Sequence, residues 1–264
     1  MNLHFYFLII IILLTRLYLM RDSKAGNPLT FLEFLGFALV PSLAIAMVYK
    51  LTWGMAHMVS ILFAISFLQF LGERLAHSKW KTSATGINFV RLLSFLAAYF
   101  FVGLWSIDRP NLLIHPLFSS FLSEIQSLPF MIAPFAQIGW DRIGITVMGF
   151  LLVVNEVNIL FRFIFDLFGV SRPGNMKSAK NGTDEREYNT GRLIGILERT
   201  IVYFLVIIGK YEAIGFIMAA KAFTRFKELE DRAFAEYVLI GTLLSIALSV
   251  GVALFVSQIL RVTS

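Results

Sequence analysis

The chain has 264 residues, of which 58% are hydrophobic, 15% aromatic and 15% charged, and none is cysteine. Soluble domains have about 25% charged and about 45–50% apolar residues, so this composition excludes a water-soluble globule and a disordered chain and predicts a protein that lies mostly in the lipid bilayer. The missing cysteine excludes disulfides, thiolate catalysis and cysteine-ligated metals, and we assign the net charge of +6 to cytoplasmic loops rather than to a nucleic-acid partner.

Long apolar runs that do not alternate predict an all-α fold, a polytopic bundle of transmembrane helices, because helices satisfy their own backbone hydrogen bonds in lipid. The first run, Leu3–Met20, has its basic residues after the apolar part. We therefore interpret it as a retained anchor with its N-terminus outside rather than as a signal peptide. Later apolar runs lie at residues 31–53, 55–71, 87–107, 143–170, 193–209 and 237–260.

Two polar segments interrupt the apolar runs. Residues 108–142 are rich in proline and include an amphipathic stretch, so we expect an outer interfacial or re-entrant segment there. Residues 171–191 form an extended polar linker that we expect on the cytoplasmic side. The chain thus divides into an N-terminal four-helix membrane region at 1–107, the outer segment, and a C-terminal membrane region at 143–264.

The short apolar segment 212–224 leaves the number of spans open between six and seven. If this segment crosses the membrane, the loops placed in the cytoplasm hold most of the lysines and arginines, as the positive-inside rule requires. If it re-enters instead, the bias of basic residues becomes weak. The charge distribution therefore favours crossing and seven spans, with six spans as the alternative.

A polar stripe in the fifth predicted span is the first candidate site. At about 100° per residue, Asn155, Asn158, Arg162 and Asp166 share one arc of a helix, and Glu156 points about 100° away. A charge at the bilayer centre costs about 2.5–3.5 kcal/mol, so the stripe is expected to face other helices, with Arg162 and Asp166 paired at i, i+4. It is an ion or substrate path, a network that fixes helix packing, or, for Arg162 and Asp166, an interfacial position.

The second candidate is the adjacent pair Glu198 and Arg199 in the sixth predicted span. As neighbours they point about 100° apart, so each needs a partner on another helix. Cross-helix pairs of Glu198 with Arg162, and of Arg199 with Glu156 or Asp166, are the partners that the sequence offers. These residues serve either a functional site or structural pairing.

The third candidate is the glycine-flanked break at 209–215, followed by Lys221. Transporters use such breaks for ion or substrate sites, but a tight turn between two spans has the same signature. Lys221 is expected to extend its amine to the cytoplasmic face. Gly191 and Gly195 form a GxxxG pattern that permits close helix contact.

Other ionisable residues carry weaker signals. Glu33 and Arg91 each lie about one turn inside a span, so we expect them at the membrane interface. The four histidines lie in different segments without a carboxylate at ligand spacing, so no metal site is predicted. No phosphate-binding loop, dinucleotide fingerprint or nucleophile elbow is present, so no cofactor is predicted and an enzyme is the less favoured class.

Residues 191–199, 213–226 and 235–245 combine charged and small residues in a specific order that includes Glu198, Arg199 and Lys221. Over about 155–260 the chain resembles a bacterial integral membrane protein family of unknown function. The resemblance implies a multi-pass protein of the bacterial inner (plasma) membrane and implies no activity.

These features support a small transporter or channel-like membrane protein with a polar intramembrane cluster. The candidate residues of its ion or substrate path are Asn155, Glu156, Asn158, Arg162, Asp166, Glu198, Arg199 and Lys221. The alternative is a membrane anchor or effector subunit that docks a soluble cytoplasmic partner through 171–191 and 227–236, or that forms a homo-oligomer. A third hypothesis is an enzyme acting on a lipid, with Arg162, Arg199 and Lys221 holding a phosphate.

Overall fold

A computed structural model describes residues 3–19, 27–50, 52–79, 84–107, 139–170, 183–224 and 232–262, together with 116, 120, 226 and 230. Among these residues the secondary structure is helical and no strand is present, which confirms the all-α prediction. The expected outer segment at 108–142, residues 171–182 of the expected linker and the charged residues 227–231 lie largely outside the described residues. The rest of the expected linker, 183–191, is wrong as an extended segment, because these residues form the first turns of the helix Thr183–Ile207.

Five helices are long and apolar enough to cross a membrane, in agreement with a transmembrane protein. They are Phe31–Val48, Trp53–Ser78, Ala84–Ser106, Asp141–Leu167 and Arg232–Val262. A shorter apolar helix covers Phe5–Leu19. The chain forms two compact units, Met1–Leu151 and Leu152–Ser264, so the boundary lies inside the predicted span 143–170, whereas the sequence was divided at 107 and 142.

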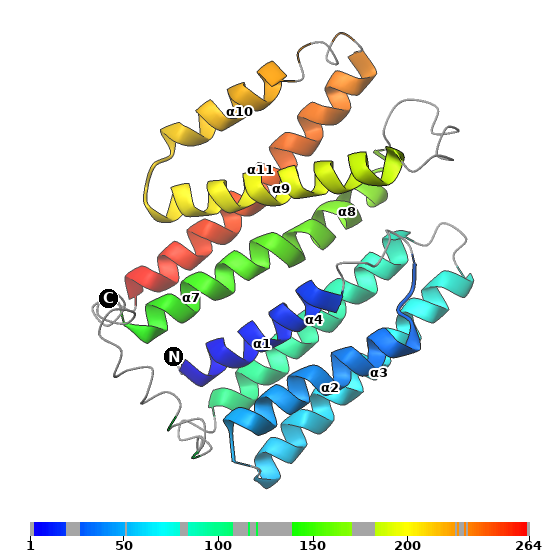
Figure 1. The fold of residues 1–264 in the computed structure, drawn as a ribbon, viewed down its shortest axis with the longest axis vertical. Helices are drawn as coiled ribbons and strands as arrows, with labels where there is room; N and C mark the ends of the chain where they lie inside the picture. Colours follow the sequence, from blue (N-terminus) through cyan, green and yellow to red (C-terminus); the bar gives the residue numbers. More distant parts are fainter. Residues whose placement is uncertain are drawn as a thin grey trace. The chain divides into compact units, whose positions relative to one another are not determined.

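The N-terminal unit is built around its first helix (Figure 1). Its helices are α1 (Leu3–Leu19), α2 (Phe31–Val48), α3 (Trp53–Lys79), α4 (Ala84–Ile107) and α7 (Trp140–Leu151). Helix α1 packs against α2, α4 and α7, and α3 packs against α2 and α4. Because Tyr6, Leu8, Ile9 and Leu13 are each at most 1% exposed, α1 forms the centre of the core.

Local chemistry explains how two of these helices begin and pack. Helix α2 starts with a capping box, in which Thr30 Oγ1 accepts from the Glu33 N–H and Glu33 Oε2 accepts from the Thr30 N–H at 2.6 Å. Glu33 is therefore a helix cap in the first turn. Helices α3 and α4 approach closely at Gly72, where a Cβ would lie 3.0 Å from Val90 Cγ1.

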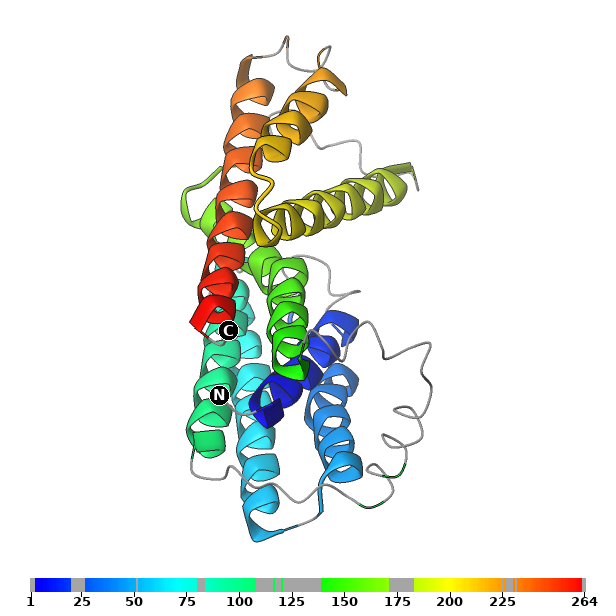
Figure 2. The same ribbon diagram turned by 90° about the vertical axis from the view of Figure 1, so that its left-hand side faces the viewer.

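The C-terminal unit is organised by one long helix, α11, which Figure 2 shows along its length. Its elements are the π-helix η1 (Leu152–Glu156), α8 (Val157–Leu167), α9 (Thr183–Ile207), α10 (Glu212–Thr224) and α11 (Arg232–Val262). Helix α11 packs against η1, α8 and α9, while α9 also contacts η1 and α10. Phe165 of α8 lies against Gly241 of α11, and its ring meets that of Tyr237 edge-on.

Helices α9 and α10 form a hairpin in which the chain reverses direction and α10 contacts α9 (Figure 1). The predicted break is a turn: Gly209 has φ of +73°, and the Lys210 N–H donates to the Leu205 carbonyl at 2.8 Å. The structure thus agrees with the tight-turn alternative. The outer face of α9 is apolar and exposed, and α10 buries no residue, which suits contact with lipid. Exposed apolar residues of this hairpin are Leu193, Ile194, Leu197, Ile201, Phe204, Ile208, Phe216 and Phe223.

Candidate functional site

The predicted stripe begins in a π-helical segment, where Asn155 and Glu156 are 7% and 6% exposed. Asn155 Nδ2 donates a hydrogen bond to Glu156 Oε1 at 2.8 Å. The sequence places these side chains about 100° apart, but that step assumes α-helical winding. A π-helix bonds i to i+5 and turns less per residue, so neighbouring side chains lie closer together. Single π-turns inside α-helices recur at functional sites.

The rest of the stripe becomes more exposed along α8. Asn158 and Arg162 are half-buried, and Asp166 is exposed in the last turn of the helix. The expectation of a uniformly inward-facing stripe is therefore met at Asn155 and fails at Asp166. For Asp166 the interfacial alternative fits the exposure that the structure shows.

Glu198 and Lys221 form an ion pair that ties the two arms of the α9–α10 hairpin together. Lys221 Nζ lies 2.5 Å from Glu198 Oε2, and the side chains are 22% and 18% exposed. The sequence offered Arg162 as the partner of Glu198 and assigned Lys221 to the cytoplasmic face. The structure instead brings Lys221 to Glu198, because the turn at 208–211 folds α10 back onto α9.

Arg199 is a buried cation with an unused donor. The residue is 6% exposed, and its Nε is buried and has no hydrogen-bond partner among the described residues. Its Nη1 lies 3.6 Å from the position of a Cβ on Gly195, so the side chain folds back along its own helix. The negative charge of Glu198 and the positive charge of Arg162 both act on this guanidinium.

The GxxxG pattern does not form a helix contact among the described residues. A Cβ on Gly191 would meet nothing within 4 Å, and one on Gly195 would meet only Arg199. A Cβ on Gly195 would make an ordinary van der Waals contact with the guanidinium, and the surface around Gly191 is open.

The N-terminal unit holds a second polar cluster that the sequence analysis missed, centred on Glu73 of α3 and Arg91 of α4. Arg91 Nε donates to Glu73 Oε1 and its Nη2 donates to Oε2, each at 3.1 Å. The two residues are 0% and 3% exposed. The Leu29 N–H also donates to Glu73 Oε2, and Arg91 Nη2 donates to the Asn27 carbonyl, each at 3.0 Å. Arg91, which we expected at the membrane interface, is thus enclosed by protein.

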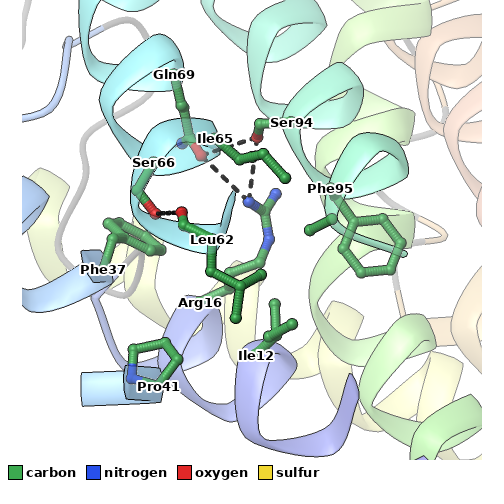
Figure 3. A pocket seen from close by; sticks show the side chains of 11 residues that line it. Ile12, Arg16, Phe37, Pro41, Leu62, Ile65, Ser66, Gln69, Ser94 and Phe95 are labelled. Carbon is green, nitrogen blue, oxygen red and sulfur yellow. Dashed lines mark hydrogen bonds between the residues drawn. The ribbon is translucent and has the colours of Figure 1, made fainter. Parts of the chain in front are cut away.

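The network continues to Arg16 of α1 through Gln69 and Ser94 (Figure 3). Gln69 Nε2 donates to Glu73 Oε1 at 2.9 Å, and Ser94 Oγ lies 2.8 Å from Gln69 Oε1. Arg16 Nη1 lies 3.5 Å from Gln69 Oε1 and 3.4 Å from Ser94 Oγ, while its Nη2 donates to the Arg91 carbonyl at 3.0 Å. Three helices therefore share one buried hydrogen-bond network.

A cavity of about 30 Å³ lies beside this network. Its polar lining comes from Arg16, Ser66, Gln69 and Ser94, as Figure 3 shows. The remaining lining is apolar: Ile12, Phe37, Pro41, Leu62, Ile65, Phe95 and Ala98. One buried water needs about 10–15 Å³ of such space, so the cavity accommodates about two waters and no larger solute.

The sequence did contain a signal for this cluster. Gln69 and Glu73 are spaced i, i+4, and Arg91 and Ser94 are spaced i, i+3, on consecutive helices joined by a short connection. We ended the third predicted span at residue 71, whereas α3 continues to Lys79. That early end placed Glu73 outside the helix in which it is buried.

No protein-family model matches the chain, and neither does any curated protein or any solved structure. Within the described part of the chain, no group of three or more histidine, aspartate or glutamate side chains is placed to hold a metal ion.

Proposed function

We propose that this chain is a multi-pass protein of the bacterial inner membrane that moves a small charged solute, as a transporter or a channel-like protein. The path would be formed by the polar side chains of the C-terminal unit. One observation carries the proposal: buried Asn155, Glu156 and Arg199 lie on η1 and α9, which pack against each other, and Arg199 retains an unused donor. Buried intramembrane charges of this kind usually mark pathways for ions or substrates.

We further propose six full spans and one re-entrant hairpin. The spans would be α1, α2, α3, α4, the helix 141–167 and α11, with the N-terminus outside. Helix α10 has 13 residues, and crossing the hydrocarbon core needs about 20. If the α9–α10 hairpin enters and leaves on one side, Lys221 and the basic residues after it stay cytoplasmic, in agreement with the positive-inside rule.

Flux through reconstituted protein tests the function. Proteoliposomes carrying the full chain would be assayed for movement of protons, potassium, chloride and phosphate. We expect flux of one of these ions in the wild type, and loss of that flux in Glu156→Gln with normal expression and folding. Glu236→Gln is the matched control, because this carboxylate is 61% exposed on α11. Wild-type vesicles no more permeable than empty vesicles to every ion tested would contradict the proposal.

A further inference from the structure

We infer that the C-terminal unit recognises a phosphate-class oxyanion at Arg199. The Arg199 site consists of Arg162, Gly195, Glu198, Arg199 and Lys221. The inference builds on the proposed function by naming the ligand class of the same cluster. Its ligand chemistry is that of a tetrahedral phosphate group, supplied either by free inorganic phosphate or by the headgroup of an anionic lipid.

The unused donor of Arg199 is the first argument. A guanidinium has five N–H groups in a planar fork, and it matches the oxygens of phosphate or carboxylate in pairs. Burying such a group costs free energy unless its N–H groups are bonded and its charge is balanced. Arg199 is 94% buried, yet its Nε bonds to nothing in the described part of the chain. An oxyanion at Nε would satisfy this donor and balance the charge.

The sign of the local charge is the second argument. Lys221 already engages the carboxylate of Glu198 at 2.5 Å, which leaves that carboxylate poorly available to Arg199. Arg162 adds a second positive charge that acts on the Arg199 guanidinium. Within the defined site the one carboxylate, Glu198, is engaged by Lys221, and a second carboxylate of the cluster, Glu156, lies on the neighbouring η1. What Arg199 offers is an unused N–H donor, which binds an acceptor oxygen and therefore favours an anion over a cation as the ligand.

Access to the site is the third argument. Arg199 folds back toward Gly195, where a Cβ would meet only Arg199 Nη1, and one helical turn further along, at Gly191, a Cβ would meet nothing within 4 Å. Exposed Leu193, Ile194 and Leu197 flank the same turns, so the guanidinium lies near the start of the apolar part of α9. In the proposed topology this is the cytoplasmic headgroup level, which both free phosphate and a lipid phosphate can reach.

The test uses the full chain in phosphatidylcholine nanodiscs. In one arm inorganic phosphate is titrated and the Kd is measured from the shift of the thermal unfolding midpoint. In the other arm phosphatidic acid is added to the bilayer. We expect at least one of these two probes to bind the wild type. Arg199→Gln should weaken that binding about tenfold or more, because a charge-assisted bidentate pair is lost. Arg199→Lys should recover only part of it.

The control is Arg232→Gln, since Arg232 is 93% exposed on α11 and its loss should leave the Kd unchanged. Arg162→Gln is the second variant, in case Arg199→Gln does not fold, and it should also weaken binding. Binding of phosphate alone assigns the site to the free ion, and binding of phosphatidic acid alone assigns it to a lipid.

Failure of both probes, or a Kd unchanged in both Arg199→Gln and Arg162→Gln, overturns the inference. Binding in a protein that shows no ion flux would retain this site and reject the proposed transport function. Ion flux without anion binding would retain the proposed transport function and reject the oxyanion site at Arg199.

Discussion

Both units bury charged side chains, but they differ in how completely these side chains are hydrogen-bonded. In the N-terminal unit, Arg91 meets Glu73 through two bonds of 3.1 Å, and further bonds from Gln69 and Leu29 occupy the same carboxylate. In the C-terminal unit, Arg199 is just as buried and keeps an unused donor. The two clusters therefore differ in how completely their buried charges are paired and not in how deeply they are buried.

The closed network has a structural consequence. Glu73 and Arg91 bond the backbone at Leu29 and Asn27, just before α2 begins, and Arg16 joins the same network from α1. Three helices and the segment just before α2 are thus fixed relative to one another by groups that have few alternative partners. The comparison predicts that variants in the N-terminal unit change stability and that variants at Arg199 change function.

The largest effect is expected at Glu73. Glu73→Ala leaves Arg91 buried without its carboxylate, and breaking a buried pair costs about 3–5 kcal/mol. The thermal midpoint in detergent should fall strongly, and little folded protein should be recovered. The double variant Glu73→Leu with Arg91→Met should restore much of the stability, because no charge is then left unpaired. If Glu73→Ala were as stable as the wild type, the paired charges of the N-terminal unit would not stabilise it, and the contrast between the two units would not hold.

A smaller loss of stability is expected at Gly72, where α3 meets α4. In Gly72→Ala the new Cβ lies 3.0 Å from Val90 Cγ1, and overpacking of this kind costs about 1–3 kcal/mol. Adding Val90→Ala should relieve the clash. Gly191→Ala is the control in the other unit, where the space is open and the gain in helix propensity is at most about 1 kcal/mol. Equal midpoints for Gly72→Ala and Gly191→Ala would contradict the close contact.

How much of this was readable from the sequence differs between fold and site. Apolar runs predicted the helical class and the positions of the long helices, because the need to satisfy backbone groups in lipid leaves few solutions. Hydropathy could not place the end of α3, since residues 72–78 are polar and still helical. The pair of Glu73 and Arg91 was therefore not predicted, although the i, i+4 spacing of Gln69 and Glu73 indicates a polar face on α3.

In the C-terminal unit, the sequence predicted which residues belong to the polar cluster but not which of them pair with each other. Buried Asn155, Glu156 and Arg199 are among the predicted residues. The π-turn at 152–156 leaves no trace in a periodicity that assumes about 100° per residue, so the meeting of Asn155 and Glu156 was not predictable. The pairing of Glu198 with Lys221 depends on how the hairpin folds back, which is a tertiary property.

A modest coupling is expected between Glu198 and Lys221. These side chains are 18% and 22% exposed, so they retain more solvent contact than the pair in the N-terminal unit. A double-mutant cycle with Glu198→Gln and Lys221→Met should give a coupling of about 1 kcal/mol or less, from unfolding midpoints in detergent. The same cycle on Glu73 and Arg91 should give a much larger value. If the hairpin pair were the stronger of the two, the contrast between the units would be reversed.

The smallest effect on stability is expected at Arg199, and it is the sharpest test of the comparison. Arg199→Met removes a buried charge whose Nε has no described partner, and replacing such a charge by an apolar side chain of similar length is often neutral or stabilising. The unfolding midpoint without added anion should therefore stay unchanged or rise, whereas Arg91→Met should lower it. Of these two variants, only Arg199→Met should lose ion flux and oxyanion binding. An equal fall of the unfolding midpoint in both variants would mean that Arg199 stabilises the fold as Arg91 does, because removing a side chain without bonds should not lower the midpoint.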